Sequence, residues 1–266
     1  MTEETGIGEE DELEGSRAPL IEHLIELRKR LIYSVIGFVV VFGICLYFAM
    51  DIYEFLVRPL SDALHDQPGR RLIYTGLTEA MLVQIKVAFF AAIMLSFPLV
   101  AIQVWAFVAP GLYKNERRAF LPFLAATPVL FAVGAAMAYY VVFPLAWSFF
   151  LSFQTPGAEA GGLPIEFEGK VNEYLDLSMK LIFSFGVMFL MPVALTLLGH
   201  VGIINSAWLR DKRKYAIILI FVVASILTPP DIFSQCSLAL PVCLLYEASI
   251  FMVRLAEKKR AAAAQI

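Results

Sequence analysis

Three glutamates close to short basic segments have the chemistry needed to bind a basic ligand. Glu22 and Glu26 lie four residues apart, so a helix through this segment places both on one face. Glu116 lies in the tight loop 110–118 between two long apolar runs. A carboxylate accepts two parallel N–H donors from the planar guanidinium of arginine, whereas the ammonium of lysine offers no such fork. These carboxylates are therefore candidate ligands for arginine side chains.

Local ion pairs offer a simpler explanation of the same residues. Glu26 and Arg30 are spaced to pair across one helical turn, which stabilises a helix by a few tenths of a kcal/mol. Glu116 can pair locally with Lys114 or Arg117. On residue types alone, local pairing is favoured over ligand binding.

The chain that positions these glutamates has the composition of a membrane protein. Of its 266 residues, 59% are apolar and 17% are charged, against roughly 45–50% and 25% in ordinary globular chains. A helix needs about 20 apolar residues to cross the hydrocarbon core of a bilayer. The sequence therefore predicts an all-α membrane protein with six transmembrane helices, with approximate spans 31–50, 82–107, 122–150, 181–201, 215–229 and 232–250.

The last two predicted spans are short. The run 215–230 rises only about 24 Å as a helix, less than the bilayer core of about 30 Å. The segment 228–231 contains two prolines, which cannot continue a helix, and an aspartate, which suits an N-cap. We therefore expect a hairpin of two helices. The alternative is one kinked helix from Tyr215 to Val253, which would far exceed the bilayer.

Lysines and arginines gather on one side of these spans. Fifteen of the 21 lie before the first span, in the second and fourth connections, or after the last span. Five lie in the first and third connections, and Lys86 lies within the second span. The positive-inside rule then places both termini in the cytoplasm and the loops 51–80 and 154–180 outside. Residues 1–18 are predicted to be an acidic, disordered cytoplasmic tail, residues 19–254 the six-helix domain, and residues 255–266 a second cytoplasmic tail.

Chemistry inside the spans is sparse. The three cysteines form no metal-ligand or disulfide pattern, and no nucleotide or hydrolase motif is present, so neither a metal, a cofactor nor an enzyme is expected. The net charge of −3 argues against nucleic-acid binding.

Two polar residues inside the predicted spans have structural explanations. Lys86 is expected to snorkel towards the external surface, and Gln235 is expected to hydrogen-bond a neighbouring helix. Without a chain of ionisable groups, an ion-coupled carrier is disfavoured; a small-solute transporter is the alternative function.

Several segments, taken together, resemble the TatC family, the multi-span receptor subunits of the twin-arginine protein translocase. The resemblance runs from about Pro19 to Arg254 and rests on segments 23–31, 103–107, 109–118 and 227–235; segments 58–60 and 139–145 also resemble the family. Further motif positions are Pro59, Pro110, Gly111, Tyr113, Pro229, Pro230 and Asp231. Several motifs in the right order make this resemblance highly specific.

The resemblance implies a fold and a function. The six helices would form a concave, cupped bundle, and the amino-terminal region and first cytoplasmic loop would bind the paired arginines of signal peptides on folded cargo proteins. Glu26 and Glu116 match the signal-binding carboxylates. Positions that shape the same surface match His23, Arg28, Phe107, Lys114, Arg117 and Arg118.

The resemblance also implies partners. Single-span TatA and TatB subunits would dock near Ile226, Leu227, Thr228 and Gln235, and further copies of the chain would join the complex. Transport across the bacterial cytoplasmic (inner) membrane would use the proton-motive force without a cofactor. One position departs from the family, because Leu190 stands where a glutamate or glutamine is common.

Overall fold

The computed structural model describes residues 7–64, 72–108, 114–154, 167–228 and 231–263. Residues 7–20, 22, 108, 114–121, 201 and 259–263 are described by their backbone alone. The described residues are almost entirely helical, and their one recorded β-bridge joins Ile73 to Lys170.

Five helical stretches are long and apolar enough to cross a membrane: His23–Tyr47, Glu79–Phe107, Pro122–Leu151, Val171–His200 and Ile232–Lys258. They belong to α1 (Ile7–Tyr47), α3 (Glu79–Val108), α4 (Lys114–Met137) with η2 (Ala138–Val142) and α5 (Phe143–Leu151), α6 (Val171–Met188) with α7 (Met191–Val201), and α10 (Ile232–Ala263). The remaining helices are shorter: α2 (Ala49–Ala63), α8 (Ser206–Asp211) and α9 (Arg213–Leu227). The chain is thus an all-helical, multi-pass membrane protein.

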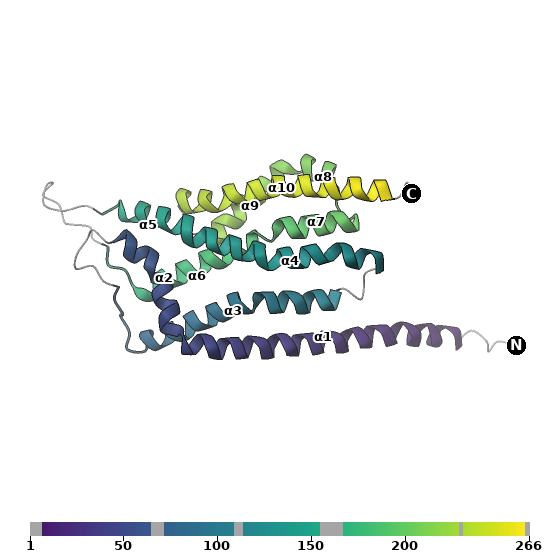
Figure 1. Cartoon of the computed structure of the whole chain (residues 1–266), viewed down its shortest axis with the longest axis horizontal. Coiled ribbons are helices and arrows are strands. Elements are labelled where there is room, and N and C mark those ends of the chain that lie inside the picture. The colour runs from purple at the N-terminus through teal and green to yellow at the C-terminus, as the bar shows by residue number, and fades with distance from the viewer. Residues whose placement is uncertain (1–6, 65–71, 109–113, 155–166, 229–230, 264–266) are drawn as a thin grey trace, which may run out of the picture.

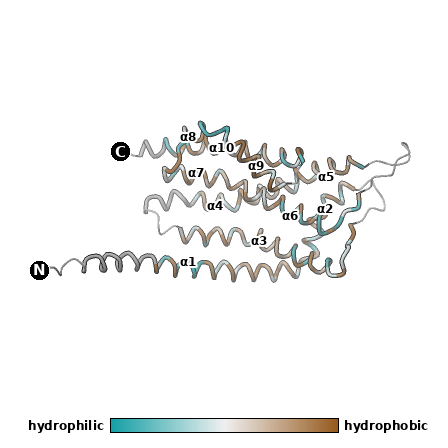
Figure 2. The backbone as a smooth tube through the Cα atoms, turned by 180° about the vertical axis from the view of Figure 1, so that it is seen from behind, coloured by the Kyte–Doolittle hydropathy of each residue, from teal (hydrophilic) through white to brown (hydrophobic). Residues whose placement is uncertain are grey.

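The long helices lie side by side along the longest axis of the molecule. In Figure 1, α1, α3, α4, α7 and α10 follow one another across the bundle, and each contacts the next. Both chain ends lie at one end of this bundle, whereas α2 and α5 lie towards the other. Figure 2 shows hydrophobic residues along α3 and α9 and hydrophilic residues around α8 and α2, near opposite ends.

The centre of the bundle depends on a close approach of α4 and α6. A Cβ atom on Gly134 would lie 2.5 Å from the carbonyl oxygen of Phe185, and one on Gly186 would lie 2.7 Å from the ring of Phe131. Small residues allow membrane helices to approach in this way. Phe185 itself is fully buried, so the two glycines make room for an aromatic core.

Two of the prolines within the apolar runs interrupt their helices. Pro144 follows the π-helical turn η2, because a proline ring clashes with the carbonyl four residues earlier and the turn widens to relieve the clash. Pro192 follows the break between α6 and α7. By contrast, Pro98 and Pro241 lie within the continuous helices α3 and α10. Proline alone therefore does not determine where these helices break.

The helix boundaries differ from the sequence prediction at several places. α1 begins at Ile7, so most of the tail expected to be disordered is helical, since glutamate favours helices and extending a helix costs less than starting one. α10 likewise continues to Ala263. The loop 51–80, which the charge distribution predicts to be external, contains most of α2, whose Leu56 and Leu60 pack one turn apart into the core.

The turn between α9 and α10 follows the sequence prediction. The two helices are separate, which confirms the hairpin over one kinked helix. Asp231 Oδ1 accepts a hydrogen bond of 2.7 Å from the backbone N–H of Ser234, so the aspartate is an N-cap as expected. Pro229 and Pro230 lie outside the described residues.

Candidate functional site: the ends of α1, α3 and α4

Two of the predicted signal-binding residues meet where α1 and α3 pack together. The His23 ring stacks on the Phe107 ring with centroids 4.2 Å apart and planes 22° apart. His23 begins the apolar stretch His23–Tyr47 of α1, and Phe107 ends the stretch Glu79–Phe107 of α3. The stack therefore joins the two helices at the end of the bundle that carries both termini (Figure 1).

Glu26 lies one turn further along α1 and is held by the expected local pair. Arg30 Nη2 donates to Glu26 Oε1 over 3.1 Å, and the two side chains are 33% and 29% exposed. A single contact of this kind is weak. Arg30 Nε and Gln103 Oε1 are buried without a partner among the described residues, and Arg28 is exposed. The carboxylate thus keeps its second oxygen outside this ion pair.

Glu116 lies in the first turn of α4, two residues after Lys114 begins that helix. Arg117 and Arg118 follow in the same turn. The side chains of these four residues, and the positions of Pro110, Gly111 and Tyr113, lie outside the described parts of the chain. The backbone of α4 begins at the same end of the bundle as the His23–Phe107 stack (Figure 1).

The residues predicted to contact partner helices lie around the C-terminal end of α9. Gln235 Nε2 on α10 donates to the carbonyl of Phe221 over 3.1 Å, which confirms its expected bond to a neighbouring helix. Thr228 is buried and its hydroxyl donates to the Ala224 carbonyl. Ile226 is 67% exposed, whereas Leu227 packs against the core. This corner combines a fixed hairpin with an exposed apolar side chain.

The structure corrects the expectation for Lys86. Instead of snorkelling, its Nζ donates to Asn172 Oδ1 over 2.6 Å and to Asp176 Oδ1 over 2.7 Å, which ties α3 to α6. Lys180, one turn beyond Asp176, donates to the carbonyl of Ile226 over 3.0 Å. Asn172, Asp176 and Lys180 share one helix face, and this four-residue spacing is a signal that the sequence carries. The sequence predicted that the fourth span begins at residue 181, so these three residues were not recognised as part of that helix.

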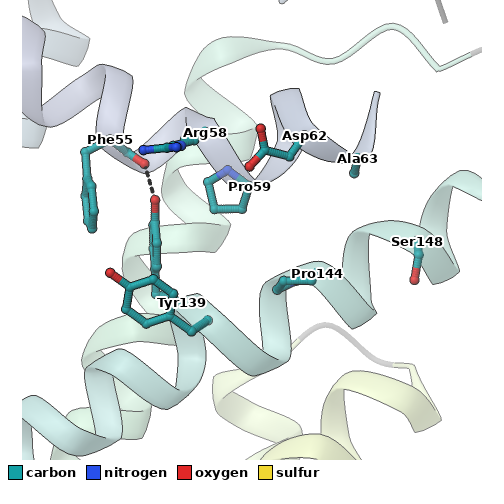
Figure 3. A pocket seen from close by; sticks show the side chains of 9 residues that line it. Phe55, Arg58, Pro59, Asp62, Ala63, Tyr139, Pro144 and Ser148 are labelled. Atoms are coloured by element: carbon teal, nitrogen blue, oxygen red, sulfur yellow. Dashed lines mark hydrogen bonds between the residues drawn. The ribbon is translucent and has the colours of Figure 1, made fainter. Parts of the chain in front are cut away.

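At the opposite end, two distant sequence motifs meet. The Tyr139 hydroxyl donates to the Phe55 carbonyl over 2.7 Å and its ring stacks on the Phe55 ring, with centroids 4.3 Å apart (Figure 3). Pro59 is buried in the same region. On the neighbouring face of α2, burial and the nearby Tyr74 raise the pKa of Tyr53 to about 12, so its hydroxyl stays neutral.

The described residues contain no cluster of side chains suited to bind a metal ion. Within the described ranges, no group of three or more histidine, cysteine or carboxylate side chains is placed to hold a metal ion. The free cysteines are Cys45, which is buried, and Cys236 and Cys243, which are half-buried.

Comparison with known proteins gives the family. Residues 22–241 match the family described as TatC, Sec-independent protein translocase protein. A protein of that name from Magnetococcus marinus is 52% identical over 245 residues, which cover 92% of this chain and 87% of the relative. The protein of that name from Escherichia coli (strain K12) is 42% identical over 236 residues, covering 89% and 88%.

Solved structures agree. The crystal structure of a twin-arginine translocase receptor, TatC, superposes with a TM-score of 0.73 at 37% identity, covering 88% of this chain and 99% of that one. A second TatC crystal structure, in the detergent DDM, gives 0.73 at 38% identity, covering 86% and 98%. These proteins are translocase components and not enzymes, and the small-solute transporter alternative is set aside. The chain therefore belongs to the TatC family and is a core subunit of the Sec-independent protein translocase.

Proposed function

We propose that the joined ends of α1, α3 and α4 bind the paired arginines of signal peptides on folded cargo proteins. The observation that carries this proposal is the His23–Phe107 stack, which fixes α1 against α3 within one turn of Glu26. Glu116 lies at the start of α4 at the same end of the bundle. A matched TatC structure is titled a twin-arginine translocase receptor, which supports the same assignment.

In this proposal each carboxylate receives one guanidinium. Arg30 occupies only Oε1 of Glu26, and an i,i+4 pair of this kind is worth about 0.3–0.5 kcal/mol. An incoming arginine that forms two parallel bonds gains about 1.5–3 kcal/mol for each charge-assisted bond and can displace the local partner at small cost. Lysine cannot form the second parallel bond, so the site discriminates between the two residues. Arg28 on α1, and Lys114, Arg117 and Arg118 in the first residues of α4, would add to the charge of the site.

We propose that the chain crosses the bacterial cytoplasmic membrane six times with both termini in the cytoplasm. Both chain ends lie at one end of the bundle (Figure 1), which requires an even number of crossings. Five stretches are long enough to cross, and α9, with 15 residues, supplies the sixth. It rises about 22 Å, so the bilayer would thin locally at α9. The helices would form a cupped wall facing this thin region.

The proposed partners dock beside α9, where the bilayer would be thinnest. Exposed Ile226, beside the corner held by Thr228 and Gln235, offers an apolar surface for the single-span TatA and TatB subunits, while Leu227 packs inside. Other copies of the chain complete the complex. The proton-motive force would drive transport, with no cofactor.

Peptide binding to the full chain in detergent or nanodiscs tests the signal-receptor proposal. A labelled signal peptide with Arg-Arg is compared with the same peptide carrying Lys-Lys. Glu26→Gln and Glu116→Gln are each expected to weaken Arg-Arg binding about tenfold or more, since each removes a charge-assisted interaction. Glu54→Gln, an exposed carboxylate at the far end on α2, is the matched control and should leave binding unchanged. Unchanged Arg-Arg affinity in both site variants would contradict the proposal.

A further inference from the structure

A pocket of about 580 Å³ lies between α2 and the η2–α5 segment, at the end of the bundle away from the termini. Its volume falls within the range of small-molecule sites. Figure 3 shows that α2 contributes Phe55, Arg58 and Asp62 to one wall, and that the opposite wall comes from Tyr139, Pro144 and Ser148. No residue of this pocket belongs to the proposed signal-binding surface, so ligand binding here does not depend on signal recognition.

The α2 wall carries one positive and one negative group that do not pair. Arg58 and Asp62 are four residues apart, a spacing that normally allows an ion pair on a helix. Both side chains are exposed, and neither makes an ion pair or a hydrogen bond within the described part of the chain. Glu54, one turn before Arg58, faces a neighbouring depression that Arg58 also borders. The pocket thus offers a free guanidinium and a free carboxylate to the same ligand.

The opposite wall is aromatic and rigid. Tyr139 is held by its hydrogen bond to the Phe55 carbonyl and by its stack on the Phe55 ring. Tyr140, which also lines the pocket, is 67% exposed. Both tyrosines belong to the π-helical turn η2, and such turns occur frequently at functional sites. The wall is therefore formed before a ligand arrives.

Polarity changes along the pocket in a definite order. Along α2 from its first residue, the pocket is lined first by the apolar ring of Phe55 and then by the cation of Arg58. The anion of Asp62 follows about 6 Å further along the helix. On the other wall, Tyr139 lies deeper in the candidate span Pro122–Leu151, and Ser148 lies one turn from its end. The apolar end thus lies further inside the candidate membrane span, and the charged end lies nearer to its edge.

This order matches one class of ligand. We propose that the pocket binds a phospholipid with a phosphoethanolamine headgroup from the adjacent leaflet. Arg58 donates to the phosphate, Asp62 accepts from the primary ammonium, and the start of an acyl chain lies against Phe55 and Tyr139. A choline headgroup has no N–H to donate to Asp62, and a glycerol headgroup has no positive charge, so both bind more weakly.

Native mass spectrometry of the full chain, exchanged into nanodiscs with equal fractions of phosphatidylethanolamine, phosphatidylcholine and phosphatidylglycerol, tests this proposal. The wild type is expected to retain the ethanolamine lipid about tenfold more than either competitor, the ratio that one charge-assisted hydrogen bond supplies. Soluble glycerophosphoethanolamine at millimolar concentration should not displace it, and displacement would contradict a membrane lipid as the source.

Two substitutions separate the roles of the charged groups. Asp62→Asn should remove the preference for ethanolamine over choline while a phospholipid is still retained. Arg58→Gln should abolish retention of all three lipids, and Glu54→Gln, on the same helix but outside the pocket, should change nothing. Asp62→Asn is nearly isosteric on an exposed side chain, so it remains informative if Arg58→Gln does not fold. Equal retention of the three lipids, unchanged by either pocket substitution, would mean adventitious annular lipid and overturn the proposal.

Discussion

Replacing Lys86 by methionine removes the charge that compensates Asp176 within the apolar part of the bundle. Lys86 lies seven residues into α3, about 10 Å along the helix, and Asp176 lies five residues into α6, about 7.5 Å along it. Their side chains remain 40% and 50% exposed. Exposed charges at this depth face lipid headgroups, water or a partner helix, and each setting gives the pair a different strength.

The separation sets the scale of the effect. Two unit charges 2.7 Å apart attract by about 1.5 kcal/mol at the dielectric constant of water and by about 6 kcal/mol at an effective value of 20. Desolvation and side-chain ordering offset part of this attraction. We therefore expect a coupling free energy of about 1–3 kcal/mol between Lys86→Met and Asp176→Asn. The double variant should be more stable than the sum of the single losses predicts.

Reversible unfolding in mixed micelles, measured for the wild type, both single variants and the double variant, yields this coupling. Lys170→Met with Glu173→Gln provides the matched control, because these side chains form an i,i+3 pair before the apolar part of α6 and are 45% and 71% exposed. The control coupling should be about 0.5 kcal/mol or less. A Lys86–Asp176 coupling as small as the control would refute the claim that this pair lies in a low-dielectric part of the bundle.

Two further substitutions test the packing of the bundle. Gly134→Ala should lower the free energy of unfolding by about 1–3 kcal/mol, since its Cβ would lie 2.5 Å from the Phe185 carbonyl; the same micelle unfolding measures it, and a neutral result would contradict the close approach of α4 and α6. Phe107→Ala should cost about 0.5–1.5 kcal/mol beyond lost burial because it removes the stack on His23, and should weaken signal-peptide binding. Full peptide affinity would show that the stack does not organise the site.

Patterns local in sequence were sufficient for much of the fold. The apolar runs predicted six membrane-crossing helices, and within the described residues five stretches are long and apolar enough to cross. The two prolines with Asp231 predicted a hairpin and its cap. Their physics acts over a few residues, through helix rise, missing N–H groups and capping. The motif 23–31 and the loop 109–118 likewise pointed to the family before any geometry was known.

Contacts between residues far apart in the chain could not be predicted from the sequence patterns. Lys86 was expected to snorkel, because nothing in its own helix shows that Asn172 and Asp176, about ninety residues later, lie within hydrogen-bond distance. Nothing in the sequence showed that the segments 58–60 and 139–145 line one pocket. Helix α2 was missed because its apolar positions form one stripe that needs the bundle to bury it.

Site-specific photocrosslinking in membranes tests the central claim most directly. A photoreactive residue replaces Glu26 or Glu116, and the probe is a signal peptide that carries either Arg-Arg or Lys-Lys. Because the neighbouring carboxylate still selects for guanidinium, strong crosslinking to the Arg-Arg peptide and its loss with Lys-Lys are predicted at both positions. Equal crosslinking to the two peptides would contradict recognition of paired arginines at the joined ends of α1, α3 and α4.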